Sequence, residues 1–240
     1  MSALIRLDDV SKSYGALRVT NRLSIRLDAG EALGVLGPNG AGKSTMFNLI
    51  TGDVRPDSGR VFLGERDITA LPPSERCRLG IGRSYQVPHP FGGMTVFENL
   101  LVGAAFGAGL TEDEALDHCV DVLERTGLIG KANQLAGTLT LLDRKRLELA
   151  KALATRPKVL LLDEIAGGLT DHEARALVET IRGIRAEGVS IVWIEHVVHA
   201  LLAVVDRLVV IHFGALLKEG TPDAVMAARE VREVYMGLDA

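Results

Sequence analysis

Apolar residues along this chain gather in short runs, and the segments between several of these runs have the spacing of helices. The runs at 32–36 and 159–162 are almost entirely aliphatic, as expected for strands buried on both faces of a sheet. The segments 171–186 and 196–205 alternate polar and apolar residues with helical periodicity. The strands that we expect are 4–10, 23–27, 32–36, 60–63, 81–86, 159–162, 189–194 and 208–211.

This order of elements predicts an α/β fold. Strands that alternate with helices form a mainly parallel sheet whose crossover connections are helical. From about 96 to 157 the pattern is helical throughout, which predicts a helical lobe inserted after the strand that ends at Gln86. No low-complexity linker or internal repeat divides the chain. We therefore expect one domain over 1–240, with 1–86 and 158–240 as the core and about 87–157 as the lobe.

Composition narrows the class of protein. The chain has 240 residues, of which 47% are hydrophobic, yet no apolar run approaches the length of a membrane span. The first six residues lack the layout of a signal peptide, and Cys77 and Cys119 have no metal-type spacing. The net charge of −4 argues against a general nucleic-acid binder. These features predict a cytosolic protein with reduced thiols and no nucleic-acid partner.

A glycine-rich run after the strand at 32–36 carries the strongest chemical signal. It matches the phosphate-binding loop G-x-x-x-x-G-K-[ST] and leads into a helix. In such a loop, backbone N–H groups and the positive end of the helix dipole bind phosphate oxygens. Lys43 is expected to reach the terminal phosphates of a nucleoside triphosphate, and the Ser44 hydroxyl to bind Mg²⁺. The residues of the run are Gly37, Pro38, Asn39, Gly40, Ala41, Gly42, Lys43, Ser44 and Thr45.

Two acids end the aliphatic strand at 159–162. Asp163 and Glu164 follow it directly, at the carboxyl end, where α/β sheets place their ligands. In a phosphate-loop protein the first acid typically holds Mg²⁺, and the second can polarise an attacking water. The alternative interpretation is that Asp163 only caps the next helix. Because the phosphate loop needs an acidic partner for its metal, we interpret Asp163 as a metal ligand and Glu164 as the catalytic base.

With these two motifs in this order, nearly the whole chain resembles the ATP-binding subunit of an ABC transporter. The resemblance implies a phosphate-loop core with an antiparallel β subdomain and a helical signature lobe. It also implies roles for three more residues. Tyr14 is expected to stack on adenine, Gln86 to contact Mg²⁺ and join core to lobe, and His196 to contact the γ-phosphate during catalysis.

Two stretches depart from the family pattern. The family has a serine-glycine-glycine signature where this chain has Leu139-Thr140-Leu141-Leu142-Asp143. Thr140 keeps a hydroxyl for a γ-phosphate across a dimer interface, but Asp143 is expected to face the phosphate with like charge. Thr170 stands where the family usually has an aspartate that couples the two sites of the dimer. These departures concern the rate of hydrolysis and the coupling of the two sites, and not the binding of ATP.

Within the family, the runs 80–86, 94–103 and 231–237 are similar to the branched-chain or hydrophobic amino-acid uptake group. The resemblance implies permease subunits in the membrane, a second ATP-binding subunit (a copy or a paralogue) and, indirectly, a periplasmic binding protein. It also implies a peripheral position on the cytoplasmic face of a bacterial inner membrane. The segment 87–91 would dock the permease.

Two other functional classes stay open at this point. A soluble ABC-type ATPase of translation or DNA repair usually has two nucleotide cores or a long coiled-coil insertion, and neither occurs here. A non-hydrolysing ATP-binding regulatory module is favoured only by the altered stretch at 139–143. Steady-state ATPase activity separates that module from the transporter subunit.

Overall fold

The computed structural model describes residues 3–236, which form two compact units. Unit 1 comprises residues 3–73 and 190–236, and unit 2 comprises 74–189. The expected division into a core and a lobe at about 87–157 is not tested by these units and stays a prediction. The last residue of the run 231–237, Gly237, lies outside the described residues.

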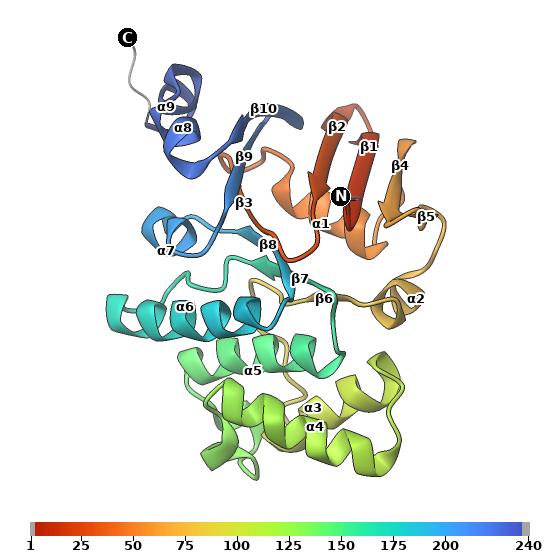
Figure 1. Ribbon diagram of the computed structural model, residues 1–240, viewed down its shortest axis with the longest axis vertical. Helices are drawn as coiled ribbons and strands as arrows, with labels where there is room; N and C mark the ends of the chain where they lie inside the picture. Colours follow the sequence, from red (N-terminus) through yellow and green to blue (C-terminus); the bar gives the residue numbers. More distant parts are fainter. Residues whose placement is uncertain (1–2, 237–240) are drawn as a thin grey trace. The chain divides into compact units, whose positions relative to one another are not determined.

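Unit 1 contains an antiparallel sheet and strands of a mixed sheet (Figure 1). The antiparallel sheet has the strand order β2-β1-β4-β5 and supplies the expected antiparallel subdomain. In the mixed sheet, β3 lies parallel to both β8 and β9, while β10 pairs antiparallel with β9. The strands are β1 (Ile5–Tyr14), β2 (Leu17–Leu27), β3 (Ala32–Leu36), β4 (Ser58–Leu63), β5 (Arg66–Asp67), β8 (Ser190–Ile194), β9 (Arg207–His212) and β10 (Ala215–Gly220).

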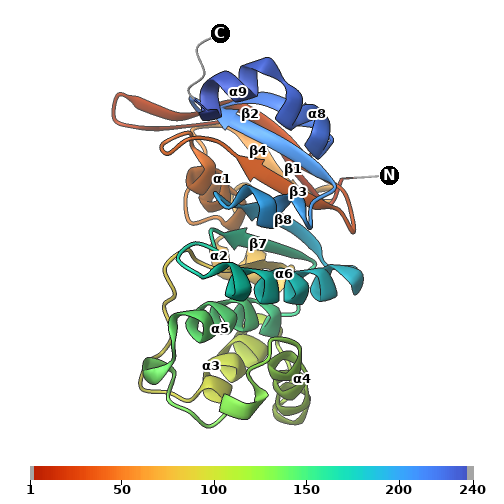
Figure 2. The same cartoon turned by 90° about the vertical axis from the view of Figure 1, so that its left-hand side faces the viewer.

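Buried aliphatic strands form the core of unit 1. All five residues of β3 and of β8 are buried, as expected from sequences that are apolar except for Ser190 at the start of β8. Gly34 in β3 has a packing reason, because a Cβ there would lie 2.4 Å from Cδ2 of Leu208 on β9. The helices of unit 1 are α1 (Lys43–Thr51), α7 (Val198–Leu202), α8 (Pro222–Ala227) and α9 (Arg229–Met236). Helices α8 and α9 pack on the hairpin formed by β9 and β10 (Figure 2).

Unit 2 combines a parallel strand pair with a helical block. β6 (Ile81–Arg83) and β7 (Val159–Asp163) pair in parallel. Helices α3, α4 and α5 all contact one another and form the block in Figure 1, which confirms the predicted helical lobe as an element of the fold. The helices are α2 (Pro73–Arg78), α3 (Val96–Val102), α4 (Glu112–Arg125), α5 (Leu141–Ala154) and α6 (Asp171–Ala186), and α2 begins at the unit boundary. A π-helical turn at Gly103–Gly107 follows α3, and short 3-10 turns lie at Ile129–Lys131 and Ala136–Thr138.

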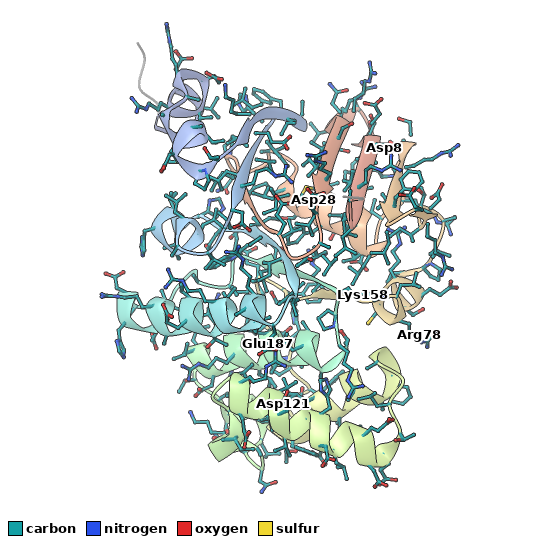
Figure 3. All side chains as sticks on the ribbon, viewed as in Figure 1. Asp8, Asp28, Arg78, Asp121, Lys158 and Glu187 are labelled. Carbon is teal, nitrogen blue, oxygen red and sulfur yellow. The ribbon has the colours of Figure 1, made fainter. Side chains whose placement is uncertain are left out.

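Arg125 connects two of these helices through carboxylates. It donates to Asp121, 3.2 Å away on α4, and also pairs with Glu187 at the end of α6. Both acids are labelled in Figure 3. The packing of α4 within unit 2 is thus fixed by charge as well as by its buried face, which includes Val122 and Leu123.

The strand boundaries differ from the predicted ones in a systematic way. β1 ends later than predicted, at Tyr14, and β2 begins earlier than predicted, at Leu17. The cause is that the hairpin continues beyond the buried apolar residues into mostly polar, exposed positions. β6 ends at Arg83 rather than at 86, because the chain turns away after its last residue paired with β7. Apolar patterning detects only the buried part of a strand.

Candidate functional site

The phosphate-loop residues form a tight turn between β3 and α1 in unit 1. Gly42 precedes the helix with φ +104°, and a Cβ there would lie 2.5 Å from the carbonyl oxygen of Val19. Gly37 is equally constrained, because a Cβ there would lie 2.3 Å from the carbonyl oxygen of Ile211. Both positions therefore need glycine, which brings the backbone of neighbouring strands against the loop.

The Lys43 side chain lies along this loop. Its ammonium group donates to the carbonyl oxygens of Gly37, at 2.7 Å, and Pro38, at 3.1 Å. Ala41 N–H closes the turn by donating to Pro38 O at 3.2 Å, and Gly214 N–H donates to Ala41 O at 3.0 Å. The loop thus surrounds the positively charged ammonium group of Lys43. Three residues of the loop region are exposed to solvent: Asn39, Gly40 and Ser44. This arrangement fits a polyphosphate in its donor set.

His196 follows β8 at the same edge of the sheet at which the phosphate loop follows β3. β3 and β8 are parallel, with Val35 opposite Ile194, so the loop after β3 and the turn after β8 begin at one level. His196 is exposed there. The preceding residue, Glu195, is fully buried and accepts hydrogen bonds from His196 N–H at 2.8 Å and Val197 N–H at 3.3 Å. Sequence reasoning gave Glu195 no role, although a buried carboxylate beside a predicted site residue is unusual.

Tyr14 is the last residue of β1, on the antiparallel sheet of unit 1. Its side chain is 49% exposed, and the Lys12 ammonium lies 5.9 Å from the ring centroid. An aromatic face left open to solvent is suited to stacking on a base. The adenine contact remains a prediction.

The two predicted acids are in unit 2, after the parallel pair of β6 and β7. Asp163 ends β7 and is buried, with 4% of its surface exposed. Arg83, at the end of β6, donates from Nη2 to Asp163 Oδ2 at 2.9 Å. Arg83 was missed by sequence reasoning, although it lies inside the run 80–86. The parallel register that sets Arg83 opposite Leu161 brings its side chain to the acid.

Glu164 has a backbone conformation that is rare for a residue with a side chain. Its φ is +47°, in the left-handed region. Gln86 Nε2 donates to its carboxylate at 2.5 Å, and Lys145 Nζ donates to its carbonyl oxygen at 3.2 Å. Strained residues of this kind are concentrated at functional sites. Gln86 thus donates to Glu164 through its amide nitrogen, and its expected contact with the metal stays a prediction.

The expectation for Asp143 was wrong. Its carboxylate is buried, 4% exposed, and does not project from the start of α5. Thr140 Oγ1 donates to it at 2.7 Å, Lys131 pairs with it, and Arg146 lies 3.9 Å away. Burial raises the pKa of Asp143, but the hydrogen bonds from Lys131 and Thr140 and the nearby positive charges outweigh burial and lower the pKa below its ordinary value. Asp143 is therefore an internal, neutralised anion.

Thr140 and Thr170 share a structural role as helix caps. Thr140 directly precedes α5 as its N-cap, and its side-chain oxygen accepts from Asp143 N–H at 3.3 Å. Thr170 begins α6 in a capping box with Glu173, whose carboxylate accepts from Thr170 N–H and Oγ1, both at 2.8 Å. The departure at Thr170 thus keeps a side chain that caps the helix well.

The acids of unit 2 fit Mg²⁺ in their donor set. Magnesium is usually bound by one or two carboxylates together with substrate phosphates, rather than by an all-protein cage. Asp163 supplies such a carboxylate. Within residues 3–236 no cluster of three or more His, Cys, Asp or Glu side chains is placed to hold a metal.

A phosphate loop between a buried strand and a helix, together with a strand that ends in two acids, defines a phosphate-loop nucleoside triphosphatase. Residues 20–167, more than half of the chain, match the family described as ABC transporter. This stretch contains the loop and both acids, while Tyr14 and His196 lie outside it. The chain belongs to the ABC transporter family.

Relatives and solved structures agree with this assignment. The chain is 35% identical to the high-affinity branched-chain amino acid transport ATP-binding protein LivG of Salmonella typhimurium, over 98% of each chain. It is 34% identical to BraF of Pseudomonas aeruginosa, of the same description, over 98% of each chain. It is also 35% identical to the lipopolysaccharide export system ATP-binding protein LptB of Acidithiobacillus ferridurans, over 99% of this chain and 98% of the relative. The ADP conformation of the ATP-binding cassette MJ1267 superposes with a TM-score of 0.90 at 31% identity, covering 99% of this chain and 100% of that one.

The protein is an ATP-binding, ATP-hydrolysing subunit of an ABC transporter. Subunits of this kind work with membrane permeases. This assignment favours the transporter class over the two alternatives left open by the sequence.

Within the part of the chain that the structure describes, no helix has the length and apolar character needed to span a bilayer.

Proposed function

We propose that the protein energises uptake of branched-chain or other hydrophobic amino acids, or related small molecules, through a membrane permease. The observation that carries this proposal is the full-length similarity to LivG and BraF, at 34–35% identity over 98% of the chain. A periplasmic binding protein would deliver the cargo. The subunit would act on the cytoplasmic face of a bacterial inner membrane.

At the nucleotide, we assign the roles that the residue types and their placement support. The amides of 37–45 and Lys43 bind the phosphates of ATP, and Tyr14 stacks on the base. Ser44, Asp163 and Gln86 hold Mg²⁺, which neutralises phosphate charge when bound. Glu164, whose carboxylate accepts from Gln86 Nε2 at 2.5 Å, orients and deprotonates the attacking water. His196 contacts the γ-phosphate.

Hydrolysis takes place in a dimer in this proposal. Each chain has one phosphate loop and one signature-like segment at 139–143, so each site combines the loop of one subunit with Thr140 of the other. The exposed Thr140 and the 48% exposed Leu141 beside it agree with a partner on this surface. The second subunit is another copy or a paralogue.

Export is the second candidate, favoured by the 35% identity to LptB. Both candidates use the same ATPase chemistry and differ in the permease and cargo. Identity alone therefore does not separate them.

Capture of the complex tests the proposal. Tagged Glu164→Gln protein is purified from native membranes with ATP and Mg²⁺, and the co-purifying chains are read by mass spectrometry. Multi-span membrane proteins in stoichiometric amount, encoded with a periplasmic binding protein for amino acids, are expected. Export components in their place would favour the second candidate, and soluble partners alone would refute the transporter proposal.

A further inference from the structure

Helix α5 presents three charged side chains spaced three residues apart, so that each lies about one turn from the next. They are Lys145, Glu148 and Lys151. Lys145 and Glu148 are buried, at 5% and 3% exposed, and the Lys151 side chain is 21% exposed. We refer to these three residues as the α5 row. Buried charges of this kind need partners, and this row binds backbone groups of His89 and Glu164.

One end of the α5 row holds the loop that follows Gln86. Glu148 Oε1 accepts from His89 N–H at 2.8 Å, and Lys151 Nζ donates to His89 O at 2.9 Å. Lys151 and Glu148 also pair with each other at 3.0 Å. Both backbone polar groups of His89 are therefore bound by charged side chains, which gives stronger hydrogen bonds than neutral partners do.

The same loop is stiff and carries exposed apolar side chains. Pro88 and Pro90 flank His89 and restrict the backbone on both sides. Val87 is 61% exposed and Phe91 is 49% exposed. A force applied to these side chains by a partner would therefore pass to the His89 peptide rather than be absorbed by a flexible loop.

The other end of the α5 row holds the catalytic turn. Lys145 Nζ donates to the carbonyl oxygen of Glu164 at 3.2 Å. Glu164 is the residue whose φ is +47°. Gly167 N–H donates to the same oxygen at 3.4 Å. Gln86 Nε2, three residues before His89, donates to the Glu164 carboxylate at 2.5 Å. The contacts thus close a ring from the loop, through α5, to Glu164 and back through Gln86 to the loop.

We propose that the α5 row couples the loop at 87–91 to the backbone of Glu164, so that the loop's position sets the geometry of the catalytic base. Lys145 and Lys151 are positioning residues in this account, since they act through backbone groups and not on ATP. The use of this coupling by a permease rests on the proposed function, whereas the coupling itself belongs to the isolated chain.

Hydrogen exchange in the isolated full-length protein tests the coupling without any transport assay. Lys151→Met removes the contact at His89, and Lys145→Met removes the contact at Glu164. Coupling is reciprocal, so each variant should speed exchange at both 87–91 and 164–169. The expected change is roughly five-fold at each segment, the factor that the loss of one hydrogen bond of ordinary net strength produces.

Matched variants separate this coupling from general loosening. Lys218→Met removes a similar cation from an exposed ion pair with Glu230, 2.7 Å long, and should change neither segment. Lys151→Arg keeps a donor and should restore slow exchange at both. If each lysine variant speeds exchange only at its own segment, the coupling is refuted.

A second measurement relates the coupling to the partner. In the reconstituted complex, Lys151→Met should lower the ATPase stimulation by permease more than Lys218→Met does. If Lys151→Met and Lys145→Met do not each speed hydrogen exchange at both 87–91 and 164–169, the inference is overturned even if transport is found. Absence of a permease would overturn the proposed function while leaving the exchange result intact.

Discussion

At the scale of single residues, the charged groups of the candidate site are held by groups of their own unit. Lys43 donates to Gly37 O and Pro38 O, so its charge is directed into the phosphate loop. In unit 2, Gln86 donates to the Glu164 carboxylate. Such preorganisation lowers the cost of arranging charges when ATP binds.

Lys43→Ala should abolish steady-state ATPase activity, with a loss of roughly 100-fold or more, because a positioned charge at the phosphates is removed. Nucleotide affinity should fall as well, as measured by calorimetric titration with ATP. Lys218→Ala, at an exposed ion pair, is the matched control and should keep activity. Undiminished hydrolysis by Lys43→Ala would contradict the role given to this residue.

Sequence predicted the site unevenly at this scale. The loop at 37–45 and the acids Asp163 and Glu164 follow from residue type and spacing. Arg83 does not, because one arginine at a strand end has no spacing signal. Its contact with Asp163 depends on the parallel register of β6 and β7, which is a tertiary property.

At the scale of elements, helix starts in unit 2 repeat one chemical pattern. A threonine precedes each of α3, α4, α5 and α6, and three residues later the helix has an acid. The pairs are Thr95 with Glu98, Thr111 with Glu114, Thr140 with Asp143, and Thr170 with Glu173. This spacing is readable from sequence as a capping box. It explains Asp143 and Thr170, which family comparison alone marked only as departures.

Asp143→Asn should destabilise the protein near neutral pH by about 1 to 3 kcal/mol, because charge-assisted bonds from Lys131 and Thr140 are weakened. The folded pKa of Asp143 is lowered. Its contribution is therefore present above the ordinary value of about 3.9 and is lost as pH falls through that value toward the folded pKa. Urea unfolding across this range should show wild type and variant converging in acid.

Asp121→Asn provides the comparison for that experiment, because Asp121 is also on a helix and pairs with an arginine but is 60% exposed. Its effect on the free energy of unfolding should be small, as for other exposed pairs. A constant difference between wild type and Asp143→Asn at every pH would contradict the account of Asp143 as a stabilising anion.

At the scale of the whole molecule, alternating strands and helices predicted the α/β class and the helical block correctly. The strand order did not follow from sequence, since β3 lies between β8 and β9, which come more than 150 residues later. That order decides the site, because it brings His196 to the sheet edge of the phosphate loop. The family assignment then adds what one chain does not contain, the permease.

We propose that this subunit hydrolyses ATP as a dimer with Glu164 as the base. The most direct test is light scattering coupled to gel filtration of Glu164→Gln with saturating ATP and Mg²⁺, beside wild type. The amide keeps a hydrogen-bond acceptor for Gln86 but cannot take a proton from water. The variant should form a stable ATP-bound dimer and hydrolyse ATP slowly, whereas the wild type should return to monomer as ATP is consumed. A variant that stays monomeric, alone and with its paralogue, or that hydrolyses ATP at the wild-type rate, would contradict it.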